Sequence, residues 1–470
     1  MGKIHAMMDM GKRSMMNSQT ALQTVSHNVA NKSTEGYSRQ RVDQVTAPPV
    51  SEGRLQLGMG SRAAAVTRVG NPFIEKQLQK ETGHMGYMDG RADTLSRVEQ
   101  VFNEQAIKGL NQYMSDFFNA YRELSNNPES VAARTMVKES AESMAQDFSR
   151  VDRQLTDIQK DIDFQLKAGV EEVNKMTSEI ADLNQQIVQV EIQGNPANDQ
   201  RDRRDFLIKK LHEKIDVKVA EGDKGSVTIQ TAGNAILVSG VDSCKLETMF
   251  NPESEKTEIY ARPTESHPPF VITDRIKGGN IGGILQVRDQ VINTFKDKVD
   301  NLAYTVAQNV NAAHSQGFDR TGRACGDFFE QLDGPEDAAK MLKVTEEVAN
   351  DVTRIASAAE QNAPGDATVA NVISMLQYRP VMDGGTSTLD DYYNSQVGRV
   401  GVIAQNAVKS REAQGNILQQ VNTLRESISG VSLDEEATKM IEFQKTFDAS
   451  ARLIRTADEM FDTVLNLKRM

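Results

Sequence analysis

The stretch of this chain that decides the fold is its last long segment, SLDEEATKMIEFQKTFDASARLIRTADEMFDTVLNL, at residues 432–467. Large apolar residues recur there at strict seven-residue intervals, at Leu433, Met440, Phe447, Ile454 and Phe461. A second row occupies the companion positions, at Phe443, Ser450, Ala457 and Val464. This heptad pattern predicts one long amphipathic helix whose apolar seam packs against another helix.

Polar residues signal where this helix begins. Ser432 and Glu435 have the spacing of a capping box, in which each side chain bonds the backbone amide of the other residue. Asp434, Glu435 and Glu436 also place negative charge on the positive end of the helix dipole. We therefore predict a helix that starts after Ser432 and is capped by Ser432 and Glu435.

The first residues of the chain mirror this pattern. Met8, Met15, Leu22 and Val29 lie seven residues apart, and a second row follows at Ile4, Gly11, Ser18 and Val25. A lone helix of this length buries too little apolar surface to offset its ordering entropy, so each terminal helix needs a partner surface. We predict an N-terminal assembly seam of Ile4, Met8, Met15, Leu22, Val25 and Val29. The C-terminal seam comprises Leu433, Met440, Phe443, Phe447, Ile454, Ala457, Phe461 and Val464.

The interior of the chain contains long tracts without helix breakers. No proline occurs between Pro128 and Pro196 or after Pro380. Apolar residues spaced by three and four predict rod-like helices over 137–190, 287–310 and 397–428. Gly430 follows the last of these where a helix C-cap favours glycine.

Two segments instead alternate between apolar and polar residues. The pattern from Val217 to Ile272 predicts short strands separated by glycine turns, and hence a small inserted β domain of about 60 residues. A β-hairpin is predicted near 39–69. The fold class expected is mainly α with a small inserted β domain, in which long coiled-coil-like helices from both chain ends form a nested, elongated multidomain rod. We expect three domains: 1–33 with 432–470 as a terminal coiled coil, 34–215 with 279–431 as a helical body, and 216–278 as the β domain.

Composition narrows the functional classes. The 470 residues carry 54 basic and 66 acidic side chains, a net charge of −12, which disfavours nucleic acid as a partner. Trp is absent and aromatics are 5%, which is unusual for an enzyme with a substrate pocket. No apolar run is long enough to cross a membrane, and Lys12 and Arg13 interrupt the place where the apolar core of a signal peptide would lie. We therefore expect no membrane insertion and no cleavable signal peptide.

Each motif that resembles a catalytic or cofactor-binding site is incomplete or lies in a segment that cannot form such a site. Gly58 to Ala63 fits a dinucleotide fingerprint, but the segment after it is too short for a crossover helix. His212-Glu213 begins a zinc-protease motif that Asp216 breaks, and Cys244 and Cys325 lack metal-ligand spacing. We predict no catalytic, metal or cofactor-binding residues, no cofactor and no enzymatic activity.

Short signatures at both ends resemble one protein family. Ser26 to Asn31 reads SHNVAN and Thr34 to Gln40 reads TEGYSRQ, and the C-terminal counterpart is GVSLDEE at 430–436. Both are similar to the bacterial flagellar axial proteins, a family of rod, hook and hook-associated proteins. Internal matches include DQRD at 199–202 and GFD at 317–319, so the resemblance spans the whole chain. The signature residues are Asn28, Asn31, Gly36, Tyr37, Arg39 and Gln40. Phe447 departs from the family, in which Tyr is common there.

The resemblance implies a structural, extracellular role in motility. Members are exported through the flagellar type III apparatus, and the hook-associated members join hook to filament. It implies assembly as a homo-oligomeric ring at the hook tip, in contact with the hook protein and with a second junction protein. A cytoplasmic export chaperone is implied at the C-terminal helix, Leu433 to Leu467 here. The larger relatives carry a second β insertion after the position of Phe329, which we expect to be missing or minimal in this chain. The alternative hypothesis is a secreted coiled-coil adhesin or translocator.

Overall fold

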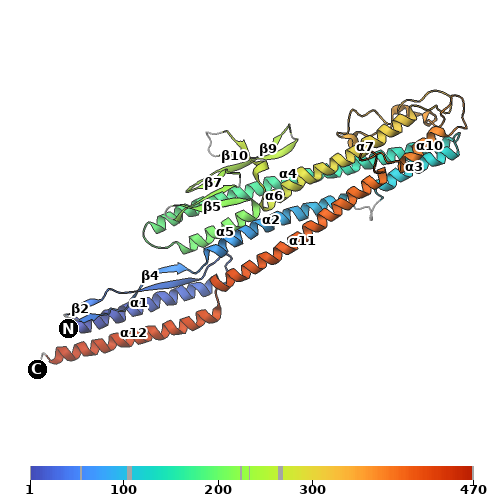
Figure 1. The fold of residues 1–470 in the computed structure, drawn as a ribbon. Helices are drawn as coiled ribbons and strands as arrows, with labels where there is room; N and C mark the ends of the chain where they lie inside the picture. The colour runs from blue at the N-terminus through green and yellow to red at the C-terminus, as the bar shows by residue number, and fades with distance from the viewer. Residues whose placement is uncertain are drawn as a thin grey trace.

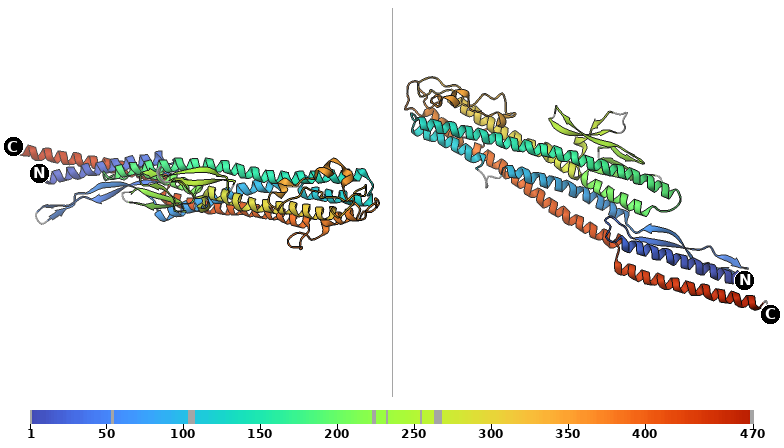
Figure 2. Two further views of the ribbon diagram at one scale, coloured as in Figure 1. Left: turned by 90° about the horizontal axis from the view of Figure 1, so that it is seen from above. Right: turned by 180° about the vertical axis from the view of Figure 1, so that it is seen from behind.

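The computed structural model describes residues 2–52, 55–102, 108–222, 225–231, 233–253, 255–262 and 268–467. The molecule is an elongated rod of nearly parallel helices with a small β region on one side (Figures 1 and 2). Both chain ends lie at the same end of the rod. The predicted class, mainly α with a small inserted β domain, is confirmed.

The two terminal helices lie side by side and extend beyond the helices of the body (Figures 1 and 2). α1 spans Gly2–Ala30 and α12 spans Leu433–Leu467. They run antiparallel, since His5 stacks near Phe461 and Asn28 bonds Glu436 at the opposite end. We call this pair the arm. Each helix receives from the other the partner surface that the sequence requires.

Four long helices and their neighbours build the body. The bounds are α2 Pro72–Val101, α3 Leu110–Asn126, α4 Val131–Glu191, α5 Asn198–Lys214, α6 Gly279–Gln286, η3 Val287–Ile292, α7 Asn293–His314 and α11 Leu389–Ser429. η3 is a π-helical turn, so α6 and α7 join as one continuous rod. The three predicted interior helices therefore all exist, and two begin earlier than their apolar seams because Ser130 and Thr388 cap them with side-chain hydrogen bonds.

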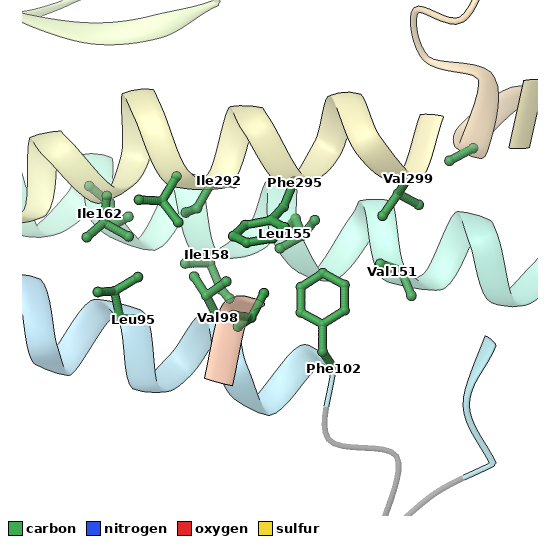
Figure 3. Packing of buried hydrophobic residues seen from close by; sticks show 14 of the residues in the cluster. Leu95, Val98, Phe102, Val151, Leu155, Ile158, Ile162, Ile292, Phe295 and Val299 are labelled. Carbon is green, nitrogen blue, oxygen red and sulfur yellow. The ribbon is translucent and has the colours of Figure 1, made fainter. Parts of the chain in front are cut away.

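The core of the body lies between α2, α4 and α7. Figure 3 shows Leu95, Val98 and Phe102 directed toward residues of the other two helices, and the rings of Phe102 and Phe295 lie 5.8 Å apart. Two glycines of α2 let helices approach closely. A Cβ on Gly86 would lie 2.0 Å from the Glu213 carbonyl oxygen, and one on Gly90 would lie 2.6 Å from that of Asn280. These contacts tie α2 to α5 and α6.

The β elements form small separate sheets. β5 Val217–Glu221, β6 Val227–Thr231, β7 Ile236–Ser239 and β8 Asp242–Ser243 make one antiparallel sheet in that order. β9 Lys245–Asn251, β10 Lys256–Arg262 and β11 Phe270–Val271 make another. The hairpin beside the arm pairs β1 Gln40–Thr46 with β4 Ser61–Arg68 and ends in β2 Val50–Glu52 with β3 Leu55–Leu57.

The far end of the body, residues 315–388, is mostly irregular. It contains the short helices α8 Ala338–Met341, α9 Glu346–Asn350 and α10 Thr368–Met375, single turns η4 Val352–Arg354 and η5 Leu376–Tyr378, and isolated bridges. Within this stretch, which is fully described, no second sheet occurs. Buried Ile355 and Ala356 in this stretch pack as extended chain, held by hydrogen bonds with Arg134 and His314.

Candidate assembly site at the base of the arm

The interface within the arm places most predicted seam residues between the two helices. Val25 and Ala457 are buried, and Ser14 and Ser450 share a hydrogen bond of 2.7 Å between their hydroxyl oxygens. A Cβ on Gly11 would lie 2.7 Å from Ile454 Cγ1, so the helices touch at this point. The remaining seam side chains are half-buried: Ile4, Met8, Met15, Leu22, Met440, Phe443, Phe447, Ile454 and Phe461.

Three predicted seam residues face solvent in the single chain. Val29 is 37% exposed, Leu433 43% and Val464 39%. All three lie near the ends of their helices. Because an ideal helix drifts about 20° per heptad from a strict seven-residue repeat, the ends of a straight seam rotate away from the partner helix. The structure does not bring these three residues into the arm interface.

Exposed apolar side chains lie on α12 beside the predicted seam. Ile441 is 59% exposed, and Leu453, Met460 and Leu465 are also exposed. Leu453, Met460 and Val464 are spaced by seven and four residues and therefore share one helix face. We call Leu453, Met460 and Val464 the outer row. Leu453 borders the arm interface, since its Cδ2 would lie 3.0 Å from a Cβ on Gly11. Ile441 and Leu465 lie about 100° or more away from this row around the helix axis. The sequence held a signal for it, since apolar residues lie on more than one face of the 432–467 pattern.

Asn28 is the centre of a buried polar cluster where the arm meets the body. Its side-chain oxygen accepts hydrogen bonds from the Tyr37 hydroxyl, at 2.8 Å, and from the Gln40 amide, at 2.9 Å. Its side-chain nitrogen donates to the Gln40 carbonyl and to Glu436 Oε2, both at 2.9 Å. All four bonding positions of the amide are thus used, and an Asp carboxylate, which has no donor, could not make the two bonds that the nitrogen donates.

Arg39 links the hairpin to the first turn of α12. Its Nε donates to Glu436 Oε1 at 2.8 Å, and its Nη2 lies 2.8 Å from Glu435 Oε2. The Glu436 side chain is 1% exposed and that of Glu435 is 61% exposed. The two carboxylates therefore serve one guanidinium in different settings, one desolvated and one in water.

The predicted helix cap is only partly present. α12 does begin directly after Ser432, whose carbonyl accepts from the Glu436 amide at 3.0 Å. The carboxylate of Glu435 is engaged by Arg39, and no bond from it to the Ser432 amide occurs in this described stretch. The prediction of a reciprocal capping box is therefore wrong, because the charged guanidinium of Arg39 binds the Glu435 carboxylate more strongly than a backbone amide does.

The same cluster reaches α5 through the DQRD motif at 199–202. Gln40 donates to Asp199 Oδ1 at 2.9 Å, and the Ser38 amide donates to Asp202 Oδ2 at 2.9 Å. Arg68 donates to both Asp202, at 2.9 Å, and Asp205, at 2.8 Å. α11 joins through its last residues, since the Arg39 amide donates to the Ser429 carbonyl at 3.0 Å. We call this set of contacts the junction cluster.

The remaining signature residues shape the turn that follows α1. Gly36 has a φ of 84°, which favours glycine, and a Cβ there would lie 2.9 Å from Phe206 Cβ. Asn31 donates to the His27 carbonyl at 3.0 Å and so closes the C-terminal turn of α1. The structure thus brings Asn28, Gly36, Tyr37, Arg39 and Gln40 to one place, while Asn31 acts locally.

Burial changes the titration of two groups in the junction cluster. It raises the pKa of the Tyr37 phenol, and nearby carboxylates, of which Asp199 contributes most, raise it further. Burial also raises the pKa of the Asp202 carboxyl, and its hydrogen bond from Arg68 opposes this rise. Tyr37 consequently remains a neutral hydroxyl donor to Asn28 at physiological pH.

The described part of the chain contains no group of side chains arranged as a metal site, no membrane-spanning helix and no disulfide bond. No cluster of three His, Cys, Asp or Glu side chains there is arranged to hold a metal ion. None of the described helices is long and apolar enough to span a membrane. Cys244 and Cys325 are both buried and unpaired with each other. The organised features are the junction cluster and the outer row.

Comparisons with known proteins agree with this architecture. Residues 95–329 match the family described as the flagellar hook-associated protein FlgK helical domain, and residues 413–467 match the flagellar basal body rod FlgEFG protein C-terminal family. The solved structure of the flagellar hook junction protein FlgK from Burkholderia pseudomallei has a TM-score of 0.68 at 15% identity, covering 75% of this chain and 100% of that chain. This likeness shows a shared fold.

Two curated relatives match along nearly their whole length. Flagellar hook-associated protein 1 of Bacillus subtilis (strain 168) is 30% identical, over 98% of this chain and 97% of the relative. Flagellar hook-associated protein 1 of Escherichia coli (strain K12) is 26% identical, over 96% and 97% respectively. Since the matches cover the arm, the body and the junction cluster alike, the chain belongs to the flagellar hook-associated protein 1 family.

Proposed function

We propose that this chain assembles as a ring at the hook tip and joins the hook to the filament through its terminal helices. The observation that carries the proposal is the outer row on α12. The arm covers one face of each terminal helix, and the outer row leaves apolar side chains at the edge of that face of α12 in solvent. Such a face gains free energy when it is covered by another subunit.

The proposed role in a ring assigns a separate function to each of the three predicted domains. We propose that 1–33 with 432–470 forms the inner coiled-coil tube, that 34–215 with 279–431 forms the body outside it, and that 216–278 is a separate β domain. The junction cluster then sets the angle between the arm and the body. Its buried, fully bonded polar groups tolerate few alternative geometries, which suits a subunit that must repeat around a ring.

The partners proposed follow from the relatives and from the position of the arm. They are further copies of this chain, the hook protein on one side and a second junction protein on the other. A cytoplasmic export chaperone would hold α12 before export by the type III apparatus. The seam and the outer row of α12 together offer it one broad apolar face. The location proposed for the assembled chain is extracellular.

Complementation of a deletion strain tests the proposal. Cells without the gene should lack hook-attached filaments, and the wild-type gene should restore swimming. Met460→Asp in the outer row should fail to restore it, because a buried carboxylate without a partner is costly. The matched control is Ile417→Asp, an exposed apolar residue on α11 outside the arm, which should restore swimming.

Two outcomes would refute the proposal. One is a deletion strain that still builds hook-attached filaments. The other is full swimming with Met460→Asp, provided that the variant is exported at the wild-type level. Electron micrographs that place the chain away from the hook tip would instead favour the secreted adhesin or translocator.

A further inference from the structure

A large groove opens at the base of the body, beside the junction cluster. Its volume is about 2260 Å³, and α2, α5, the end of α11 and the turn after α1 line it. Most arginines in its wall are neutralised within the chain: Arg39, Arg68, Arg201 and Arg425 all pair with carboxylates. We call it the basal groove.

The lysines of the basal groove are not neutralised in the same way. Six lysines line it and make no ion pair among the described residues: Lys32, Lys76, Lys80, Lys209, Lys218 and Lys277. Three lining carboxylates are likewise outside any ion pair: Glu35, Asp216 and Glu426. The groove lining as a whole holds 11 basic and 9 acidic side chains, an excess of two positive charges, in a protein whose net charge is −12.

Lys209 stands out among the six. It is half-buried in the groove wall, and burial lowers the pKa of its ammonium group. The nearby Arg425 and Lys210 lower that pKa further, while Glu35 and Glu75 oppose them. A partly desolvated cation with no ion-pair partner in the described chain gains more from an incoming carboxylate than a fully hydrated lysine does.

We propose that the basal groove holds a carboxylate-rich segment of a second copy of this chain. The inference rests on the proposed ring assembly and adds to it a contact made by the body. Charge complementarity argues for it, since every neighbouring copy is strongly acidic while the groove is basic. An acidic segment of the described chain that forms no ion pair is the loop 327–337 at the far end of the body, with exposed Asp327, Glu330, Asp333, Glu336 and Asp337 and no lysine or arginine.

Zero-length cross-linking tests the proposal. Equal amounts of ¹⁵N-labelled and unlabelled purified chain are mixed. The mixture is assembled on hooks isolated from cells that lack the gene. It is then treated with a carbodiimide, which joins amines to adjacent carboxylates. The expected result is mixed-isotope peptide pairs that join groove lysines to Asp or Glu of another copy. The acidic peptide in those pairs identifies the segment that enters the groove.

A variant pair sharpens the result. Lys76→Glu with Lys80→Glu changes two exposed lysines of the groove, and Lys409→Glu changes an exposed lysine of α11 outside it. The double variant should lower the yield of mixed-isotope groove pairs at least several-fold, whereas Lys409→Glu should leave it unchanged.

Groove lysines that are linked only within one copy, only to another protein, or not at all would overturn the proposal. The same sample separates this failure from failure of the ring. Mixed-isotope links between α12 helices, for example through exposed Lys445, report ring assembly independently. If those links form and groove links do not, the groove inference alone is wrong.

Discussion

Removal of the Glu436 carboxylate is the sharpest test of the junction cluster. Glu436→Ala leaves the Arg39 guanidinium and the Asn28 amide without their shared acceptor, in a place where the Glu436 side chain is 1% exposed. Breaking a buried pair by removing one partner costs about 3 to 5 kcal/mol. The neighbouring Glu435 is the matched control, since it pairs with the same guanidinium but is 61% exposed, so Glu435→Ala should cost about 0 to 1 kcal/mol.

Hydrogen exchange resolved along the chain measures both effects. With Glu436→Ala, protection of amides in the first turns of α12 and the last turns of α1 should fall by roughly 100-fold or more, because about 1.4 kcal/mol corresponds to a factor of ten. With Glu435→Ala the same amides should change by less than about tenfold. Equal loss of protection in the two variants would refute the argument that desolvation, rather than charge alone, makes the cluster hold the arm.

Further predictions concern the body. Gly86→Ala should lower the thermal unfolding midpoint and destabilise the body by about 3 kcal/mol or more, because the added Cβ would lie 2.0 Å from the Glu213 carbonyl oxygen. The control is Gly398→Ala in α11, which has open space around it and should be neutral or stabilising by up to about 1 kcal/mol. Equal unfolding midpoints for the two variants would contradict the close packing of α2 against α5. The His314 ring donates to the Gly326 carbonyl, accepts from the Ala356 amide and is buried, and this burial lowers its pKa from 6.5 to about 4. A depressed histidine pKa stabilises the fold above pH 6.5 and loses that contribution as the pH falls toward 4, about 3 kcal/mol in all. NMR titration should therefore show His314 still neutral at pH 5.5, and a midpoint near 6.5 would contradict its burial.

Sequence periodicity predicted the rods and the strands because each of these buries a regular stripe of side chains. The seams over 137–190 and 433–464 repeat every three to four residues, so α4 and α12 follow from local spacing. The irregular stretch 315–388 could not be predicted in this way. Arg134 supplies the hydrogen bonds to Ile355 and Ser357 that hold it, across 221 and 223 residues of sequence, and no local pattern indicates such partners.

The junction cluster was predicted in part. The signature marked Asn28, Gly36, Tyr37, Arg39 and Gln40 as a unit, and the structure gathers them. It did not reveal that Glu436 would be their buried acceptor, because Glu436 sits among three consecutive acids that look alike in sequence. Only the fold distinguishes the one that faces Asn28 from the two that face water.

A density map of the hook–filament junction isolated from the native host tests the central claim most directly. We predict a ring of copies between hook and filament, with α1 and α12 lining the central channel and the outer row of α12 covered by the adjacent subunit. A map in which the arm points away from the channel, or in which Met460 and Val464 remain in solvent, would contradict the proposal that the terminal helices assemble the ring.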